Sequence, residues 1–259
     1  IMKRRLITKK FNAWISKRVN ETGEILSVKK FNVGQSNPTY LLNCENKKIV
    51  LRSKPRGSLL RGAHRIDREF RVMSALQQSN IPVPQMIYYC NDLSILGVDF
   101  FLMNFVDGKL ETDPALVKCS PIQRKKIYIS KLDILINLGK LNLKKLKLDD
   151  YGKSSNYLQR QIDLWIKQYR SSQTKQISSM EYLINNLKPK IPDIFDKMEP
   201  ILIHGDFRID NMFFDKKIKN KINALIDWEL STIAPPFIDF SFWSLMLRFD
   251  RNWPIRGLG

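Results

Sequence analysis

The chain reads His204-Gly205-Asp206-Phe207-Arg208-Ile209-Asp210-Asn211 between two short apolar segments, 201–203 and 212–214. Its polar positions follow the pattern H-x-D-x-x-x-x-N, on a loop between predicted strands, where functional side chains most often sit. Asp206 is spaced to accept a proton from an attacking hydroxyl, and Asn211 can turn back to hold a metal ion. The candidate catalytic residues are therefore Asp206, His204, which would brace the loop, and Arg208.

A second acidic motif follows the first. Asp227 lies sixteen residues after Asn211, at the end of an apolar strand, in the sequence Ile226-Asp227-Trp228-Glu229. This ordered pair of motifs is typical of protein-kinase-like phosphotransferases, in which Asn and the second Asp hold Mg²⁺ against the nucleotide phosphates. The Trp-Glu pair stands where a eukaryotic protein kinase has Phe-Gly, so we do not expect a eukaryotic protein kinase. The expected acceptor is a small-molecule hydroxyl. The simpler interpretation makes both aspartates turn or cap residues.

Around these motifs the chain divides into a strand-rich part and a helical part. The pattern predicts an α+β, bilobal, protein-kinase-like fold. Residues 1–106 would form a β-rich N-terminal nucleotide-binding lobe, and residues 107–259 a mostly helical C-terminal catalytic and substrate lobe. The expected strands are 26–33, 38–44, 47–53, 85–91 and 98–105, and the expected helices are 64–79, 121–141, 155–171 and 176–188.

The loop between the first two predicted strands is a candidate phosphate-binding loop. Gly34, Gln35, Ser36 and Asn37 can form a tight turn whose backbone N–H groups meet phosphates, although a plain hairpin turn would look the same.

The third predicted strand supplies a cation for the nucleotide. Val50 and Arg52 share one face of this strand, and Arg52 can clasp phosphate or carboxylate oxygens. Glu69 on the following helix is its candidate partner, Lys54 is the competing cation, and an exposed Arg with an exposed Glu is the ordinary alternative.

The junction between the two predicted lobes would hold the base of the nucleotide. Met103, Asn104 and Val106 lie there, and an adenine would rest between apolar side chains while it reads backbone groups.

Composition narrows the class of protein. The 259 residues, 43% hydrophobic and 27% charged, suit one large domain or two small lobes. No apolar run could span a bilayer, no secretory signal is recognisable, and three scattered cysteines predict neither zinc nor disulfides, so the cytoplasm is the expected compartment. The net charge of +19 fits an anionic partner or a general preference for lysine. Without a recognisable nucleic-acid module, we expect no specific nucleic-acid partner.

On these residues the chain resembles the aminoglycoside phosphotransferase, or choline-kinase-like, family. It is most similar to the branch fused to, or encoded beside, acyl-CoA dehydrogenases. The similarity runs from about Gly34 to Phe240. It is carried by the segments 34–40, 50–52, 67–72, 81–84, 157–161, 204–211 and 226–232.

The resemblance implies ATP or GTP as donor, Mg²⁺ as cofactor, Asp206 as base, and Asn211 and Asp227 on the metal. Arg52 stands where the superfamily usually has Lys, and members of the branch commonly have Arg. Three residues of the helical insert, Arg160, Gln161 and Trp165, fall where the superfamily binds its acceptor. Ordinary helix packing and surface polarity explain these three equally well.

The resemblance also bears on the acceptor and the partner. Aminoglycosides are cationic, so the net charge of +19 favours an anionic acceptor such as a hydroxyacyl-CoA or a related acid. An acyl-CoA dehydrogenase domain or neighbour is the implied partner, and a nucleotide-binding pseudokinase is the alternative function. Family members continue beyond the position of Gly259, so we expect an apparently truncated second lobe. Gly139 and Ala234-Pro235 depart from the branch, which usually has His and Gly-Asp there.

Overall fold

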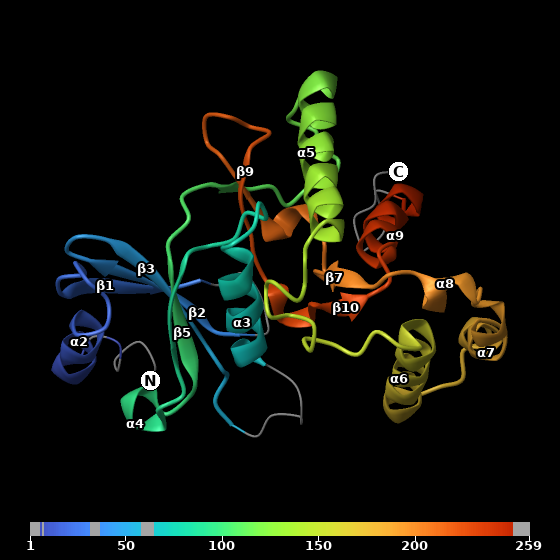
Figure 1. The fold of residues 1–259 in the computed structure, drawn as a ribbon, viewed down its shortest axis with the longest axis horizontal. Helices are drawn as coiled ribbons and strands as arrows, with labels where there is room; N and C mark the ends of the chain where they lie inside the picture. Colours follow the sequence, from blue (N-terminus) through green and yellow to red (C-terminus); the bar gives the residue numbers. More distant parts are fainter. Residues whose placement is uncertain (1–5, 7, 32–36, 58–64, 251–259) are drawn as a thin grey trace.

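The N-terminal part is built on one antiparallel sheet. The structure, a computed structural model, describes residues 6, 8–31, 37–57 and 65–250 (Figure 1), so the predicted loop residues Gly34, Gln35 and Ser36 lie outside it. The strand order is β1-β2-β3-β5-β4. The strands are β1 (Ile25–Lys30), β2 (Thr39–Cys44), β3 (Lys48–Ser53), β4 (Met86–Cys90) and β5 (Phe100–Asn104).

Two helices cover the two faces of this sheet. Side chains alternate along a strand, and in β5 Phe100 and Leu102 join the apolar cluster of helix α2 (Lys9–Ser16), whereas Phe101 joins that of helix α3 (Ile66–Leu76). The α3 side chains predicted to share a face do so, and Met73 and Leu76 are fully buried. Burial of both faces fixes the register of the strand that carries Arg52.

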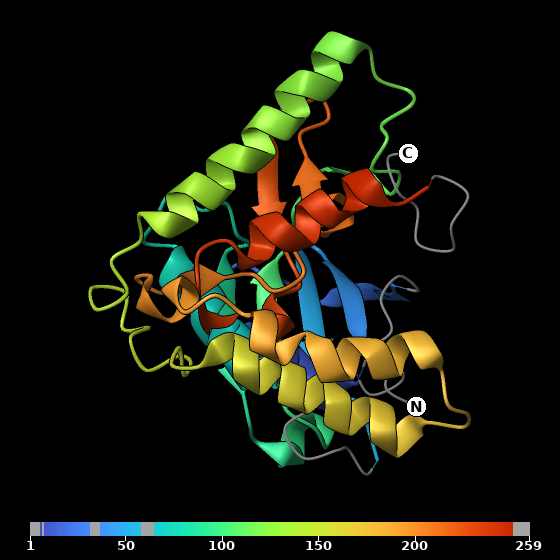
Figure 2. The same ribbon diagram turned by 90° about the vertical axis from the view of Figure 1, so that its right-hand side faces the viewer.

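The C-terminal part is mostly helical (Figures 1 and 2). Its long helix α5 (Pro121–Gly139) begins with a capping box, in which the side chains of Ser120 and Gln123 satisfy each other's backbone N–H groups. Helices α6 (Tyr157–Ser172) and α7 (Ser178–Asn186) run side by side, joined by an ion pair between Arg170 and Glu181. Helix α9 (Ile238–Leu245) lies beside α5.

Two small sheets hold the polar motifs between the helices. Strand β7 (Ile201–Ile203) pairs with β10 (Thr232–Ala234), and β8 (Met212–Phe214) lies between β6 (Lys109–Leu110) and β9 (Ile222–Leu225). The remaining elements are short: helices α4 (Leu93–Leu96) and α8 (Ile194–Lys197), and 3-10 turns at Lys188–Lys190, Ile209–Asn211, Trp228–Leu230 and Met246–Arg248.

The α+β prediction is confirmed, since every predicted strand and helix is present with its ends shifted by a few residues. Helices α2, α4, α8 and α9 and strands β6 and β10 were not predicted, because they are short or lack a clear period. Within the described ranges, no helix is both long and apolar enough to cross a membrane.

Candidate active site

The loop that follows β7 is held from within by His204. Its imidazole is fully buried, Nε2 lies 2.9 Å from the Ile226 carbonyl oxygen, and Nδ1 accepts from the Asp206 N–H at 3.2 Å. Because Nδ1 is an acceptor, Nε2 carries the proton in the neutral ring. Burial lowers the pKa of His204, so the ring stays neutral. His204 therefore joins the loop to the end of β9, the bracing role expected for it.

A second brace comes from Asp239 at the start of α9. Its carboxylate accepts from the backbone N–H of His204 at 2.6 Å and of Gly205 at 2.8 Å. The chain turns sharply here, since Gly205 has φ +84° and a Cβ on it would lie 2.5 Å from the Leu230 carbonyl oxygen. Helix α9 thus fixes the bend that presents Asp206.

Asp206, Asn211 and Arg208 form one hydrogen-bonded group. The Asn211 Nδ2 atom donates to Asp206 Oδ2 at 3.0 Å and to the Asp206 carbonyl oxygen at 2.9 Å. Arg208 Nε lies 3.1 Å from Asp206 Oδ1, and Arg208 Nη2 lies 3.3 Å from Asp210 Oδ2. The Asp206 side chain stays 24% exposed, so its carboxylate is oriented but still accessible to a ligand.

The second motif faces Arg52 of the N-terminal sheet. Asp227 follows β9 with φ +67°, an unusual conformation for a non-glycine residue that often marks a functional site. Its Oδ1 lies 2.5 Å from Arg52 Nη2, while Arg52 Nε lies 2.9 Å from Glu69 Oε2 and Glu229 Oε2 lies 3.5 Å from Arg52 Nη2. The predicted Arg52–Glu69 ion pair is thus present, and one guanidinium serves three carboxylates.

The charges in this cluster shift one another's protonation. Burial alone would lower the pKa of Arg52, but Glu69, Asp227 and Glu229 more than offset it and raise that pKa. Burial raises the pKa of Glu69 to about 7, against the opposing effect of Arg52. A perturbed carboxyl beside a shared cation is common at functional sites.

Other predicted nucleotide-site residues lie on or beside the N-terminal sheet. Val50 is directly opposite Met103 in the sheet register, and Asn104 donates its side-chain N–H to Gln85 at 2.6 Å. Asn37 donates to Glu229 at 3.0 Å and so joins the end of the predicted phosphate loop to the second motif. Lys54 instead pairs with Asp99 at 2.5 Å, and among the described residues it has no ion pair with the carboxylates around Arg52.

The three predicted substrate residues lie on α6, away from this group. No residue of α6 is buried, and Trp165 is 65% exposed. Arg160 donates to the Lys153 carbonyl oxygen and stacks near Tyr157. In the described chain, no hydrogen bond or ion pair joins Arg160, Gln161 or Trp165 to the catalytic loop, so their role stays a prediction.

Sequence reasoning missed three charged residues of the site. Glu229 was read as a replacement for glycine, and Asp239 was given no role. Lys131, buried on α5, was not singled out. A signal for Lys131 did exist, because it interrupts an apolar stripe made by Ile127, Ile134 and Leu138 at helical spacing.

Comparison with known proteins gives consistent results. Residues 27–258 match the phosphotransferase enzyme family. The chain is 40% identical to acyl-CoA dehydrogenase family member 10 of Mus musculus over 226 residues, 87% of this chain and 21% of the relative. It is also 40% identical to family member 11 of Homo sapiens over 234 residues, 90% of this chain and 30% of the relative. The chain thus spans less than a third of these curated relatives.

Solved structures show the same fold. A Ralstonia eutropha protein described as a candidate aminoglycoside phosphotransferase superposes with a TM-score of 0.84 at 35% identity, over 96% of this chain and 73% of that one. The gentamicin complex of APH(2″)-IIa superposes with a TM-score of 0.66 at 19% identity, over 90% of this chain and 73% of that one. The predicted kinase-like fold is therefore confirmed.

Proposed function

The chain belongs to the phosphotransferase enzyme family, and from this premise we propose that it transfers the γ-phosphoryl group of ATP or GTP to a small-molecule hydroxyl. The observation that carries the proposal is the meeting of three distant segments. Arg52 of β3 contacts Asp227 at 2.5 Å, and the Asp227 segment is joined through Ile226 and His204 to the loop that bears Asp206. The residues proposed as cation, metal ligand and base are thus linked by direct contacts, which supports phosphoryl transfer.

The proposed roles follow from the contacts of each side chain. Asp206, oriented by Asn211 and Arg208, accepts the proton of the acceptor hydroxyl. Arg52, held by Glu69, binds phosphate oxygens of the nucleotide. His204 and Asp239 act as positioning residues, since their side chains form hydrogen bonds with backbone groups of the loop and of Ile226. Most of the rate then comes from positioning and charge stabilisation.

Asn211 and Asp227 fit a magnesium ion. The Nδ2 atom of Asn211 is engaged with Asp206, whereas its Oδ1 atom accepts no hydrogen bond from the described residues and remains available as a ligand. Amide and carboxylate oxygens suit Mg²⁺, which also takes oxygens from phosphates and water. Among the described residues, no group of three or more His, Cys, Asp or Glu could hold a metal ion by itself. Bound there, Mg²⁺ would neutralise charge on the transferred group.

The proposed nucleotide site lies where the two lobes join. Val50 and Met103, side by side on one face of the sheet, would form an apolar wall against the base, and the backbone near Asn104 and Val106 would read its edge. A lobe boundary between residues 106 and 107 is supported by the pairing of strands, because β5 ends the first sheet at Asn104 and β6 already pairs with β8.

We propose an anionic acceptor, a hydroxyacyl-CoA or a related hydroxy acid. Two observations support it: the net charge of +19, and the acyl-CoA dehydrogenase names of long relatives that share this region. An acyl-CoA dehydrogenase domain or neighbouring protein is the proposed partner. We also propose that the acceptor contacts helix α6 at Arg160, Gln161 and Trp165.

The test is phosphoryl transfer from ATP and GTP, with Mg²⁺, to a panel of hydroxy acids, their CoA thioesters, aminoglycosides, choline and sugars. We expect transfer to one anionic class, and Asp206→Asn should lower kcat by about 10²- to 10⁴-fold with little change in nucleotide affinity. Nucleotide binding without transfer to any acceptor, identical in wild type and variant, would instead favour a pseudokinase.

A further inference from the structure

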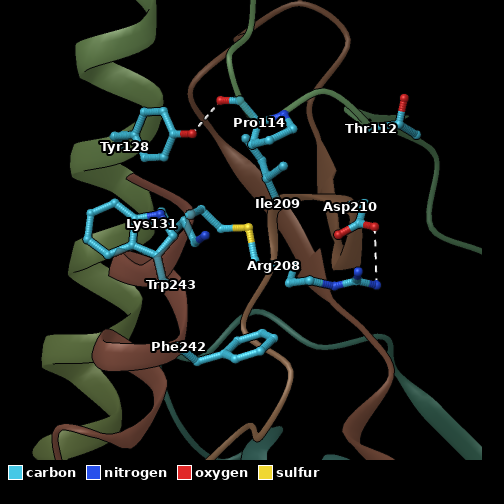
Figure 3. Close-up of a pocket in the computed structure, with 10 residues that line it drawn as sticks. Thr112, Pro114, Tyr128, Lys131, Arg208, Ile209, Asp210, Phe242 and Trp243 are labelled. Atoms are coloured by element: carbon cyan, nitrogen blue, oxygen red, sulfur yellow. Dashed lines mark hydrogen bonds and ion pairs between the residues drawn. The ribbon is translucent and has the colours of Figure 1, made fainter. Parts of the chain in front are cut away.

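A cavity of about 340 Å³ lies beside the catalytic loop, within the usual range for small-ligand pockets (Figure 3). Tyr128 and Lys131 of α5 form one wall, and Phe242 and Trp243 of α9 form another. Arg208 borders it, and because Arg208 Nε lies 3.1 Å from Asp206 Oδ1, the cavity adjoins the proposed base.

Lys131 is an unusual residue for such a wall. It is 2% exposed, and among the described residues its ammonium has neither a hydrogen bond nor an ion pair. Its Nζ atom faces the rings of Phe207 at 5.1 Å and Trp243 at 5.2 Å. Ring faces offset only part of the cost of burying a cation. Consistent with this, burial lowers the pKa of Lys131 to about 7.

The neighbouring carboxylates do not account for this lysine. Asp239 already accepts two backbone N–H groups, one on each oxygen, and Asp210 pairs with Arg208. Asp206 is likewise engaged by Asn211 and Arg208. Lys131 therefore lines the cavity as a donor without an acceptor, which is the arrangement expected when a ligand supplies the anion.

We propose that this cavity binds the carboxylate end of a short hydroxy acid, with Lys131 as the anion-binding residue. The apolar carbon chain would lie against Phe242 and Trp243, and the hydroxyl would reach past Arg208 to Asp206. The inference rests on the proposed function and narrows its acceptor to an acid whose carboxylate is free and whose chain is short.

The test is titration calorimetry of the protein with 4-hydroxybutyrate and 6-hydroxyhexanoate, compared with their methyl esters and CoA thioesters. We expect the acids to bind at least about tenfold more tightly than the esters, and Lys131→Met to abolish this preference while nucleotide affinity stays unchanged. Lys125→Met is the matched control, because Lys125 is an exposed lysine on the same helix. Met246→Trp, which fills the cavity, should weaken binding of acids and esters alike.

Equal affinity for acids and esters in the wild type, or an acid preference that survives Lys131→Met in a protein that melts cooperatively and no lower than the wild type, would overturn the proposal. So would tight, Lys131-independent binding of the CoA thioesters alone. Phosphoryl transfer is measured on the same samples. Transfer to uncharged alcohols without acid binding removes this site but keeps the kinase, whereas Lys131-dependent acid binding without any transfer keeps the site and removes the kinase.

Discussion

Gly205 determines the bend of the catalytic loop, because its φ of +84° and the nearby Leu230 carbonyl oxygen leave no room for a Cβ. We expect Gly205→Ala to destabilise the fold by about 1–3 kcal/mol and to lower kcat as Asp206 shifts. Thermal melting and steady-state kinetics measure the two effects. Gly139→Ala is the matched control. A Cβ at this helical position meets nothing within 4 Å, so the protein should become slightly more stable and remain active.

Lys131 should leave a signature in the pH dependence of stability. Its pKa falls from 10.5 in the unfolded chain to about 7 in the fold, so between these values the unfolded state holds the extra proton. Wild-type stability should therefore rise from pH 7 to pH 10 relative to Lys131→Met. The variant should be the more stable protein at pH 7, by a few kcal/mol at most, and its advantage should shrink toward pH 10.

Urea unfolding of wild type and variant at a series of pH values measures this difference. A constant difference in the free energy of unfolding across the range would contradict the buried, unpaired state of Lys131.

At the scale of single residues, the sequence predicted those site residues that lie at a characteristic spacing along one segment. His204, Asp206 and Asn211 share one loop, and their geometry follows from a fixed local spacing. Asp239 could not be predicted in this way, because its partner N–H groups lie 34 and 35 residues away and only the packing of α9 brings them together. Lys54 was a reasonable alternative to Arg52, but in the structure it forms an ion pair with Asp99 instead.

At the scale of elements, α3 joins the two parts of the molecule. It carries Glu69, the partner of Arg52. Arg68, the neighbour of Glu69 on the same helix, donates to the Tyr151 carbonyl oxygen at 2.6 Å and stacks over the Tyr151 ring at 4.1 Å. The Tyr151 hydroxyl lies 2.8 Å from Ser231 Oγ, just after the second motif. Movement of α3 is thus coupled to both sides of the site.

Tyr151→Phe tests this coupling, because it removes the hydroxyl and keeps the ring. We expect a loss of about 1 kcal/mol in stability, lower kcat, and faster amide hydrogen exchange in α3. Tyr182→Phe is the control, since Tyr182 is 61% exposed. Unchanged exchange in α3 would show that other contacts hold the helix.

Elements with a strong period were the predictable ones. The pattern of Ile66, Phe70, Met73 and Leu76 anticipated α3 because one face of that helix is buried against the sheet. Helix α9 is apolar around most of its surface, so its pattern has no clear face, and β6 has only two residues. The small sheets that hold the motifs depend on pairing between distant segments, which single-strand patterns do not encode.

For the whole molecule, the net charge of +19 is the dominant property. Mutual repulsion of like charges opposes the compact state, and salt screens it over about 10 Å at 0.1 M. We expect the melting temperature to rise as NaCl increases from about 50 to about 500 mM, and the KM for an anionic acceptor to rise over the same range. A neutral acceptor is the control, and its KM should not change. Equal salt effects on both acceptors would point to nucleotide binding as the affected step.

The contact between Arg52 and Asp227 makes ligand binding an exchange of partners. The Nη2 atom of Arg52 lies 2.5 Å from Oδ1 of Asp227, and the proposed magnesium ion would bind this same carboxylate. A metal ion that binds alone would have to displace Arg52 from Asp227, and Arg52 would then keep only Glu69 and Glu229 as partners. A nucleotide that binds with the metal would bring phosphate oxygens, which can accept hydrogen bonds from the displaced Arg52. We therefore expect that the proposed metal and nucleotide would bind with positive heterotropic cooperativity, each raising the affinity of the other by the same factor.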